Sequence, residues 1–284
     1  MRTIYLNKVR GLVKNYLPLY LFAFMPLLMS CDYIEEADRL IAVDDAHTDT
    51  PVDTLKSAVR NVLLEDFTGQ RCSNCPTGTE VIEQLQEIYG ERLIAVGIHG
   101  GPLGFKGTAT VLGLATDVGD EYYSHWQLEY QPVGLVDRHG AVNYTEWAKA
   151  VRDEMAIPSD VKMEVKAALN GSQINITVTA EAYNDYTGML QVWLLEDGIT
   201  ATQAMPDGTN NRNYVHNHVL RTPVNGDWGE AITIGKGEQK SRSYQQAVDE
   251  AWNAANLSIV AFVYNDSGVM QAAKRQVIEL IIDN

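Results

Sequence analysis

Two cysteines separated by two residues constrain the fold of this chain more than any other feature. Cys72-Ser-Asn-Cys75 is followed at once by Pro76, a residue that favours the first turn of a helix. Before the motif, residues 58–67 are rich in apolar and β-branched side chains, the pattern of a strand. After it, residues 77–89 carry apolar residues at helical spacing. A C-x-x-C motif at such a strand–helix junction is typical of a redox-active dithiol.

An α/β domain is predicted around this motif. Residues 93–98 form a continuous apolar run, the pattern of a parallel strand that is covered on both faces. A glycine-rich stretch begins at His99, a further strand is expected over residues 132–138, and a helix over 144–155. Together with the elements beside the cysteines, these segments predict an α/β domain over residues 58–157.

The rest of the chain changes to short segments in which apolar and polar residues alternate. Alternation with period two buries one face of a strand and leaves the other in water. The first two such segments, 161–165 and 174–180, are separated by Asn170-Gly171, a strong hairpin signal. One helix is expected near residues 244–255. We therefore predict an all-β antiparallel sandwich domain over residues 158–284, with further strands over 189–195, 214–220, 257–264 and 269–280.

The position of the two cysteines predicts their chemistry. Cys72 precedes the first turn of the expected helix, where unpaired backbone N–H groups and the helix dipole favour a thiolate over a thiol. The neighbouring Arg71 adds a positive charge that favours the thiolate as well. Cys75 lies three residues further on, where it can resolve a mixed disulfide. The motif therefore predicts thiol–disulfide exchange in which Cys72 attacks and Cys75 resolves.

Two other roles for the cysteine pair stay open at this point. In an oxidising compartment the pair can be a permanent disulfide that only pins the start of the helix. A zinc site needs four ligands, and one C-x-x-C supplies two. His216 and His218 are two residues apart in a predicted strand, but no third ligand is evident near them, and His99 is a single loop histidine. We therefore predict no metal site and no cofactor.

The N-terminus has the order of a bacterial secretory signal. Residues 1–30 hold four basic and no acidic residues, and the apolar run over residues 17–29 is short for a membrane-spanning helix. The run ends Leu28-Met-Ser-Cys31, which resembles a lipobox and implies cleavage before Cys31 and acylation of its thiol. Residues 31–57 are acidic and lack periodicity, so we expect them to form an extended tether.

The charge balance excludes some partners. The whole chain has a formal charge of −15, and without residues 1–30 it carries 18 basic and 37 acidic residues, a formal charge of −19. Nucleic-acid phosphates require neutralisation by lysine and arginine, so no nucleic-acid partner is expected. Anionic lipid would not attract such a surface either. Membrane association is therefore predicted to occur through a lipid anchor on Cys31.

Several of these segments together resemble a known family. Glu65-Asp-Phe-Thr-Gly-Gln-Arg-Cys-Ser-Asn-Cys-Pro76 resembles the active-site segment of the thioredoxin superfamily. Pro132, at the start of an expected strand, resembles the cis-proline of that superfamily, and Asp66 matches the position of its buried acid. With the lipobox and the C-terminal β domain included, the chain resembles the 28-kDa outer-membrane-protein family of thioredoxin-like bacterial lipoproteins.

This resemblance implies a location and a substrate class. The location is the outer membrane, with a lipid anchor and the folded part facing the periplasm or the surface. The substrates are thiols or disulfides of exported proteins, with Asp66 assisting proton transfer and Pro132 presenting backbone to an extended substrate strand. The chain departs from thioredoxins at Arg71, where tryptophan is common, and at Ser73-Asn74, where Gly-Pro is common.

Two functions therefore stand as hypotheses. The first is thiol–disulfide exchange on exported proteins by a membrane-anchored lipoprotein. The alternative is an outer-membrane or surface lipoprotein that binds an unknown partner and in which the Cys72–Cys75 disulfide is only structural. The glycine-rich insert after His99 bears on this choice, because it lengthens the segment between Cys75 and Pro132 and could cover the groove beside the dithiol.

Overall fold

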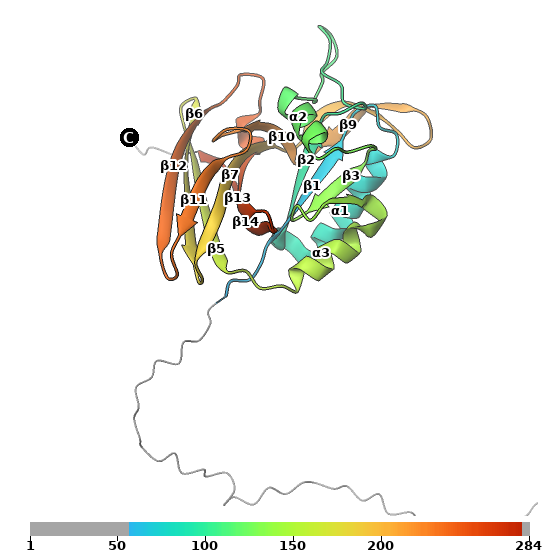
Figure 1. Cartoon of the computed structure of the whole chain (residues 1–284). Helices are drawn as coiled ribbons and strands as arrows, with labels where there is room; N and C mark the ends of the chain where they lie inside the picture. Colours follow the sequence, from blue (N-terminus) through green and yellow to red (C-terminus); the bar gives the residue numbers. More distant parts are fainter. Residues whose placement is uncertain (1–56, 280–284) are drawn as a thin grey trace, which may run out of the picture. The chain divides into compact units, whose positions relative to one another are not determined.

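The computed structural model describes residues 57–279, which form a mostly β structure with mixed sheets and three α-helices (Figure 1). The predictions made for the signal peptide, for Cys31 and for the acidic tether before residue 57 lie outside the described residues. Within the described range, the helices are too short or too polar to cross a membrane.

The predicted strand–helix–strand unit around the cysteines is present. The first two strands are parallel and are joined through the first helix, and the third strand pairs antiparallel with the first strand on its other side. The elements of this half are β1 (Val62–Thr68), α1 (Cys75–Tyr89), η2 (Gly90–Arg92), β2 (Leu93–His99), α2 (Asp117–His125), β3 (Val133–Val136), β4 (Ala141–Asn143), η3 (Tyr144–Glu146) and α3 (Trp147–Met155).

Both faces of β1 and β2 are buried, as the continuous apolar run of β2 predicts. Leu64 faces α1 and α3 and belongs to a cluster that includes Ile82 and Trp147. The preceding residue, Leu63, faces the opposite side and packs in a second cluster with Tyr122 of α2. Neighbouring residues on these strands therefore point into two different cores, which decides where each residue near the cysteines ends up.

The second half of the chain consists of strands joined by short turns. The predicted hairpin at Asn170-Gly171 joins the first two of them, whose residues pair along their whole length. The elements are β5 (Val161–Asn170), β6 (Gln173–Ala182), β7 (Tyr186–Glu196), β8 (Ile199–Ala204), β9 (Asn210–His216), β10 (Val219–Pro223), β11 (Glu230–Ile234), β12 (Gln239–Ala247), η4 (Ala254–Asn256), β13 (Leu257–Asn265), β14 (Gly268–Gln276) and β15 (Ile278–Glu279).

One large sheet takes strands from both halves of the chain. Its order is β14-β13-β7-β10-β2-β1-β3-β4, with β11 paired to β7. The junction lies where β10 pairs in parallel with β2, through Val219 and Gly97. The predicted boundary between residues 157 and 158 therefore falls in a structure whose two halves share a sheet, and it stays a prediction.

A second sheet, ordered β12-β6-β5-β15, covers part of the first. Alternate residues of β6, such as Ile176 and Val178, point into a shared apolar cluster with Val192 of β7 and Ile259 of β13. The intervening β6 residues are partly exposed. The period-two alternation predicted for this part of the chain therefore corresponds to one buried face and one partly exposed face.

Two sequence predictions in this half are wrong. The segment expected to be helical near residues 244–255 contains no α-helix: residues 244–247 end β12, which pairs with β6 over its full length, residues 248–253 are turn and irregular backbone, and the short turn η4 follows. Because β12 is mostly exposed, its side chains carry no apolar alternation that would have indicated a strand. The single strand expected over 214–220 is divided between β9 and β10, with His218 at a φ of 58° in the break.

Candidate functional site

The two cysteines form a disulfide at the start of α1. Their sulfurs are 2.10 Å apart. Cys75 is the first residue of the helix, and Pro76 lies in its first turn, as the sequence predicts. Cys72 lies in the preceding turn, where its backbone N–H donates to the carbonyl of Gly69 at 3.0 Å. The disulfide therefore closes the turn that leads from β1 into α1.

Both cysteines are buried, with exposed fractions of 1% for Cys72 and 2% for Cys75. On one side the glycine-rich insert, residues 100–116 between β2 and α2, lies against the turn that holds them. The backbone N–H of Arg71 donates to the carbonyl of Leu103 at 3.1 Å. Gly69 passes so close to the insert that a Cβ atom there would lie 2.3 Å from the same carbonyl oxygen. The insert, suspected from the sequence as a cover, therefore lies against the turn that carries the disulfide.

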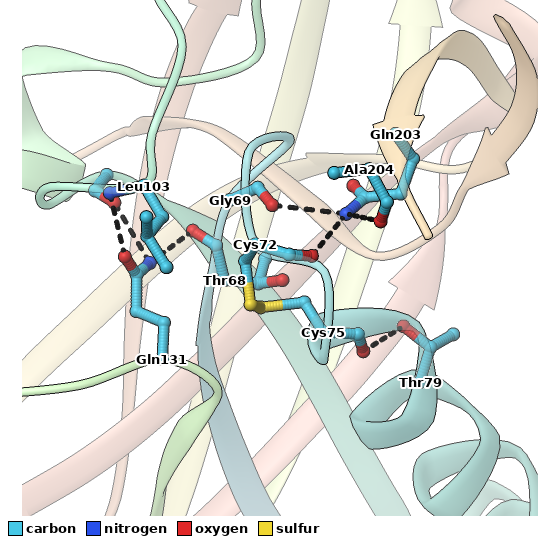
Figure 2. The surroundings of a disulfide bond; sticks show 10 residues. Thr68, Gly69, Cys72, Cys75, Thr79, Leu103, Gln131, Gln203 and Ala204 are labelled. Atoms are coloured by element: carbon cyan, nitrogen blue, oxygen red, sulfur yellow. Dashed lines mark hydrogen bonds between the residues drawn. A yellow bond between two sulfur atoms is a disulfide. The ribbon is translucent and has the colours of Figure 1, made fainter. Parts of the chain in front are cut away.

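On the other side the β8–β9 hairpin completes the cover (Figure 2). The side-chain amide of Gln203 donates to the carbonyl of Cys72 at 2.8 Å and to that of Gly69 at 3.3 Å. The backbone N–H of Ala204 donates to the carbonyl of Gln70 at 2.9 Å. The hairpin is thus bonded directly to the segment that holds the disulfide.

Gln70 connects the two covering segments. Its side-chain amide donates to the carbonyl of Leu112 in the insert and to that of Thr202 in β8. Its side-chain oxygen accepts from the backbone N–H of Leu114 at 2.8 Å. The sequence did not predict Gln70 and Gln203 as site residues, because their amides bond mainly to segments dozens of residues away and no local pattern marks them.

Asp66 lies beside the disulfide. It lines a cavity of about 200 Å³ together with Cys75, His99 and His216. Its side chain is buried, and its Oδ1 atom has no hydrogen-bond partner among the described residues. Burial raises the pKa of Asp66 to about 8, so the carboxyl group is mostly protonated at neutral pH.

Glu65, the preceding residue, faces the opposite core. Its carboxylate forms an ion pair of 2.9 Å with Arg138, and both side chains are buried. The aliphatic and aromatic side chains of the second cluster surround this pair. Of the two neighbouring acids, Asp66 is therefore the one on the side of the disulfide.

The buried histidines occupy the same cavity. The rings of His99 and His216 are 5.3 Å apart, and one nitrogen of each, Nδ1 and Nε2 respectively, has no partner among the described residues. Burial lowers the pKa of His99 to about 3 and that of His216 to about 4, so both rings are neutral at physiological pH. His218 also lines this cavity, and its Nδ1 atom lies 3.0 Å from Oδ1 of Asp197. No group of three or more ligand residues within residues 57–279 is placed to hold a metal ion.

Pro132 packs against the helix that begins at Cys75. The peptide bond between Gln131 and Pro132 is cis. A Cβ atom on Gly78 of α1 would lie 3.3 Å from the Cβ and Cγ atoms of Pro132, so the missing side chain makes room for the proline ring. The side-chain amide of Gln131 donates to the carbonyls of Thr68 and Gly100 and ties this loop to the end of β1 (Figure 2).

Comparisons with known proteins place the chain in a class of outer membrane proteins. A family model for the outer membrane protein Omp28 matches residues 119–280, more than half of the chain. The chain belongs to the Omp28 outer membrane protein family. A search of curated proteins finds no match.

Several solved structures match this chain. HBP35 of Porphyromonas gingivalis matches with a TM-score of 0.61 and 17% identity, over 80% of this chain and 79% of that one. A domain of the outer membrane lipoprotein Omp28 from the same organism is 27% identical over 43% of this chain and 92% of that one, with a TM-score of 0.33. A protein of Agrobacterium tumefaciens matches with a TM-score of 0.48 and 16% identity, over 77% of this chain and 95% of that one. The first of these shows that the fold is shared at low identity.

Proposed function

We propose that this chain is a lipid-anchored outer-membrane protein that binds a partner and in which the Cys72–Cys75 disulfide is structural. The observation that carries the proposal is the burial of both cysteines. Thiol–disulfide exchange requires a thiolate to reach one sulfur of the disulfide. With the insert on one side and the β8–β9 hairpin on the other, neither sulfur is accessible in the folded state.

The disulfide has a clear structural task in this arrangement. It fixes the turn from Gly69 to Cys75, and the backbone of this turn accepts hydrogen bonds from Gln203 on one side. On the other side its backbone N–H at Arg71 bonds the insert. The fixed turn therefore holds the insert and the β8–β9 hairpin in place and shapes the surface between them.

The lipid anchor is the part of the proposal that depends on residues outside the described range. Membership of an outer membrane protein family supports it, together with the signal-like residues 1–30 and the lipobox-like ending at Cys31. Growth of expressing cells with radiolabelled palmitate should label the wild type and leave a Cys31→Ser variant unlabelled. Equal labelling of both proteins would remove Cys31 as the attachment point.

Reduction kinetics test the structural role of the disulfide. The full chain is incubated with dithiothreitol with and without urea, and free thiols are counted by alkylation and mass spectrometry. We expect the native disulfide to be reduced only as fast as the protein opens, and the unfolded one to be reduced at once. Rapid reduction of the native protein would overturn the proposal.

The second candidate function is thiol–disulfide exchange by a form of the protein in which the disulfide becomes exposed. The protonated Asp66 favours this function. A protonated carboxyl beside Cys75 can give a proton to the Cys75 thiolate when a substrate thiolate attacks Cys72 and the disulfide breaks. A second substrate thiol then displaces Cys72, so the substrate leaves oxidised and the chain is reduced. The parallel β1 and β2 joined by α1, and Pro132 packed on that helix, also support the resemblance to thioredoxins.

Trapping decides between the two candidates. In cells, a Cys75→Ser variant cannot resolve a mixed disulfide at Cys72, so an exchange protein would accumulate covalent complexes with exported proteins. The structural proposal expects no such complexes above the level of a Cys72→Ser, Cys75→Ser double variant, which serves as the matched control. Non-reducing gels with immunodetection give the answer.

A further inference from the structure

An open groove of about 810 Å³ lies between the insert and the β8–β9 hairpin. Its lining includes Gln70 and Arg71, the two residues just before Cys72, so the turn fixed by the disulfide forms part of the groove. Gln70 bonds both flanking segments, to Leu112 on one side and Thr202 on the other. Hydrogen bonds to Gln70 therefore hold both segments that form the groove in place.

The charge of the groove is opposite to that of the chain. Arg71 and Arg212 line it, and no aspartate or glutamate does, although the chain as a whole has a formal charge of −15. Across residues 57–279 neither arginine forms an ion pair with a carboxylate. The guanidinium of Arg71 lies 4.9 Å from the ring centroid of Phe105, which orients it beforehand. Two unneutralised guanidinium groups therefore offer paired donors to an anionic group.

Apolar side chains and a strand edge complete the surface. Val111 and Leu112 of the insert are 41% and 50% exposed and line the groove. The edge of β8 that faces Gln70 is not paired with another strand in the described part of the chain. Thr202 and Ala204 bond Gln70 along this edge, and strand alternation puts the N–H and C=O of Thr200 on the same edge. Gln70 thus occupies the part of the edge at Thr202 and Ala204, and the backbone of Thr200 is left to bond an extended peptide beside the apolar side chains.

We propose that this groove binds an extended peptide segment in which carboxylate side chains alternate with apolar ones. The carboxylates would pair with Arg71 and Arg212, the apolar side chains would contact Val111 and Leu112, and the peptide backbone would bond β8 at Thr200. The inference rests on the proposed function as a binding protein and names the chemistry of its partner. It does not require the disulfide to exchange.

Fluorescence anisotropy with the full chain in detergent tests the inference. The probes are three labelled decapeptides with alternating Glu-Leu, Gln-Leu or Lys-Leu sequences. We expect the Glu-Leu peptide to bind and the other two to bind at least about tenfold more weakly, a difference of about 1.4 kcal/mol. An Arg71→Gln, Arg212→Gln double variant should weaken Glu-Leu binding by a similar factor, and added salt should weaken it in the wild type.

An Arg275→Gln variant is the matched control, because this exposed arginine on β14 is not part of the groove. Circular dichroism checks that each variant is folded. Absent binding of the Glu-Leu peptide, equal binding of the Gln-Leu peptide, or unchanged binding by the double variant would each overturn the proposal. Binding to phosphatidylglycerol vesicles that the double variant loses, without peptide binding, would overturn it in favour of a lipid surface. A disulfide that still resists dithiothreitol would then leave the structural-crosslink proposal standing.

Discussion

Replacing Asp66 with asparagine should make the free energy of unfolding less dependent on pH and higher at alkaline pH. Burial raises the pKa of Asp66 from 3.8 to about 8 in the folded protein, whereas the unfolded chain ionises this group at its ordinary pKa. The contribution of the protonated Asp66 carboxyl to the free energy of unfolding is complete below about pH 4, declines as pH rises, and levels off above about pH 8. Within that window each pH unit lowers the free energy of unfolding of the wild type by about 1.4 kcal/mol. The total loss at neutral pH is about 4 kcal/mol.

The asparagine side chain keeps the shape of the carboxyl group and stays neutral at every pH. Any fixed cost of burying its amide therefore shifts the free energy of unfolding of the variant by the same amount throughout. The expected signature is a gap between variant and wild type that widens by about 4 kcal/mol from about pH 5 to about pH 8.

Urea unfolding followed by circular dichroism, with the disulfide kept oxidised, measures this gap. Asp266→Asn, in the exposed turn between β13 and β14, is the control for the same substitution at the protein surface. A pH-independent difference for Asp66→Asn would refute the argument, because it would mean that Asp66 is ionised in the folded state across the whole range.

Two further predictions concern the β8–β9 hairpin beside the disulfide and the Glu65–Arg138 ion pair on the opposite face of β1. Gln203→Ala removes the amide that bonds the carbonyl of Cys72, so dithiothreitol should reduce the native disulfide several-fold faster, measured by alkylation, whereas Gln245→Ala on the exposed β12 should not change the rate. Glu65→Gln leaves the buried charge of Arg138 unpaired and should lower the free energy of unfolding by about 3 kcal/mol or more in urea titrations. A loss below about 1 kcal/mol would mean that water reaches this pair.

The parts of the fold that were predicted correctly have strong local signals. The apolar run that became β2, the helical spacing after Cys75 and the Asn170-Gly171 turn each depend on neighbouring residues only. The strand β12 had no such signal, because it is an exposed strand held by backbone pairing with β6. Its conformation is decided by a partner about 65 residues away, which a single-sequence pattern does not contain.

The candidate site shows the same division. The sequence places Cys72, Cys75 and Asp66 near each other because they lie within one strand–turn–helix segment. The sequence also suggested the insert as a cover, but it did not predict the contact of the β8–β9 hairpin, because Gln203 lies 131 residues from Cys72 along the chain. Period two alone also could not say which of Glu65 and Asp66 faces the disulfide, since both faces of β1 are buried.

The pairing of β10 with β2 has a practical consequence for dividing this protein into fragments. The family model begins at residue 119, inside α2 and after β2. A recombinant piece that starts there would contain β10 without the neighbour that caps its outer edge. Unpaired strand edges recruit other chains, so such a fragment should self-associate. Crystallisation or binding work on this family member therefore calls for a start point ahead of β1.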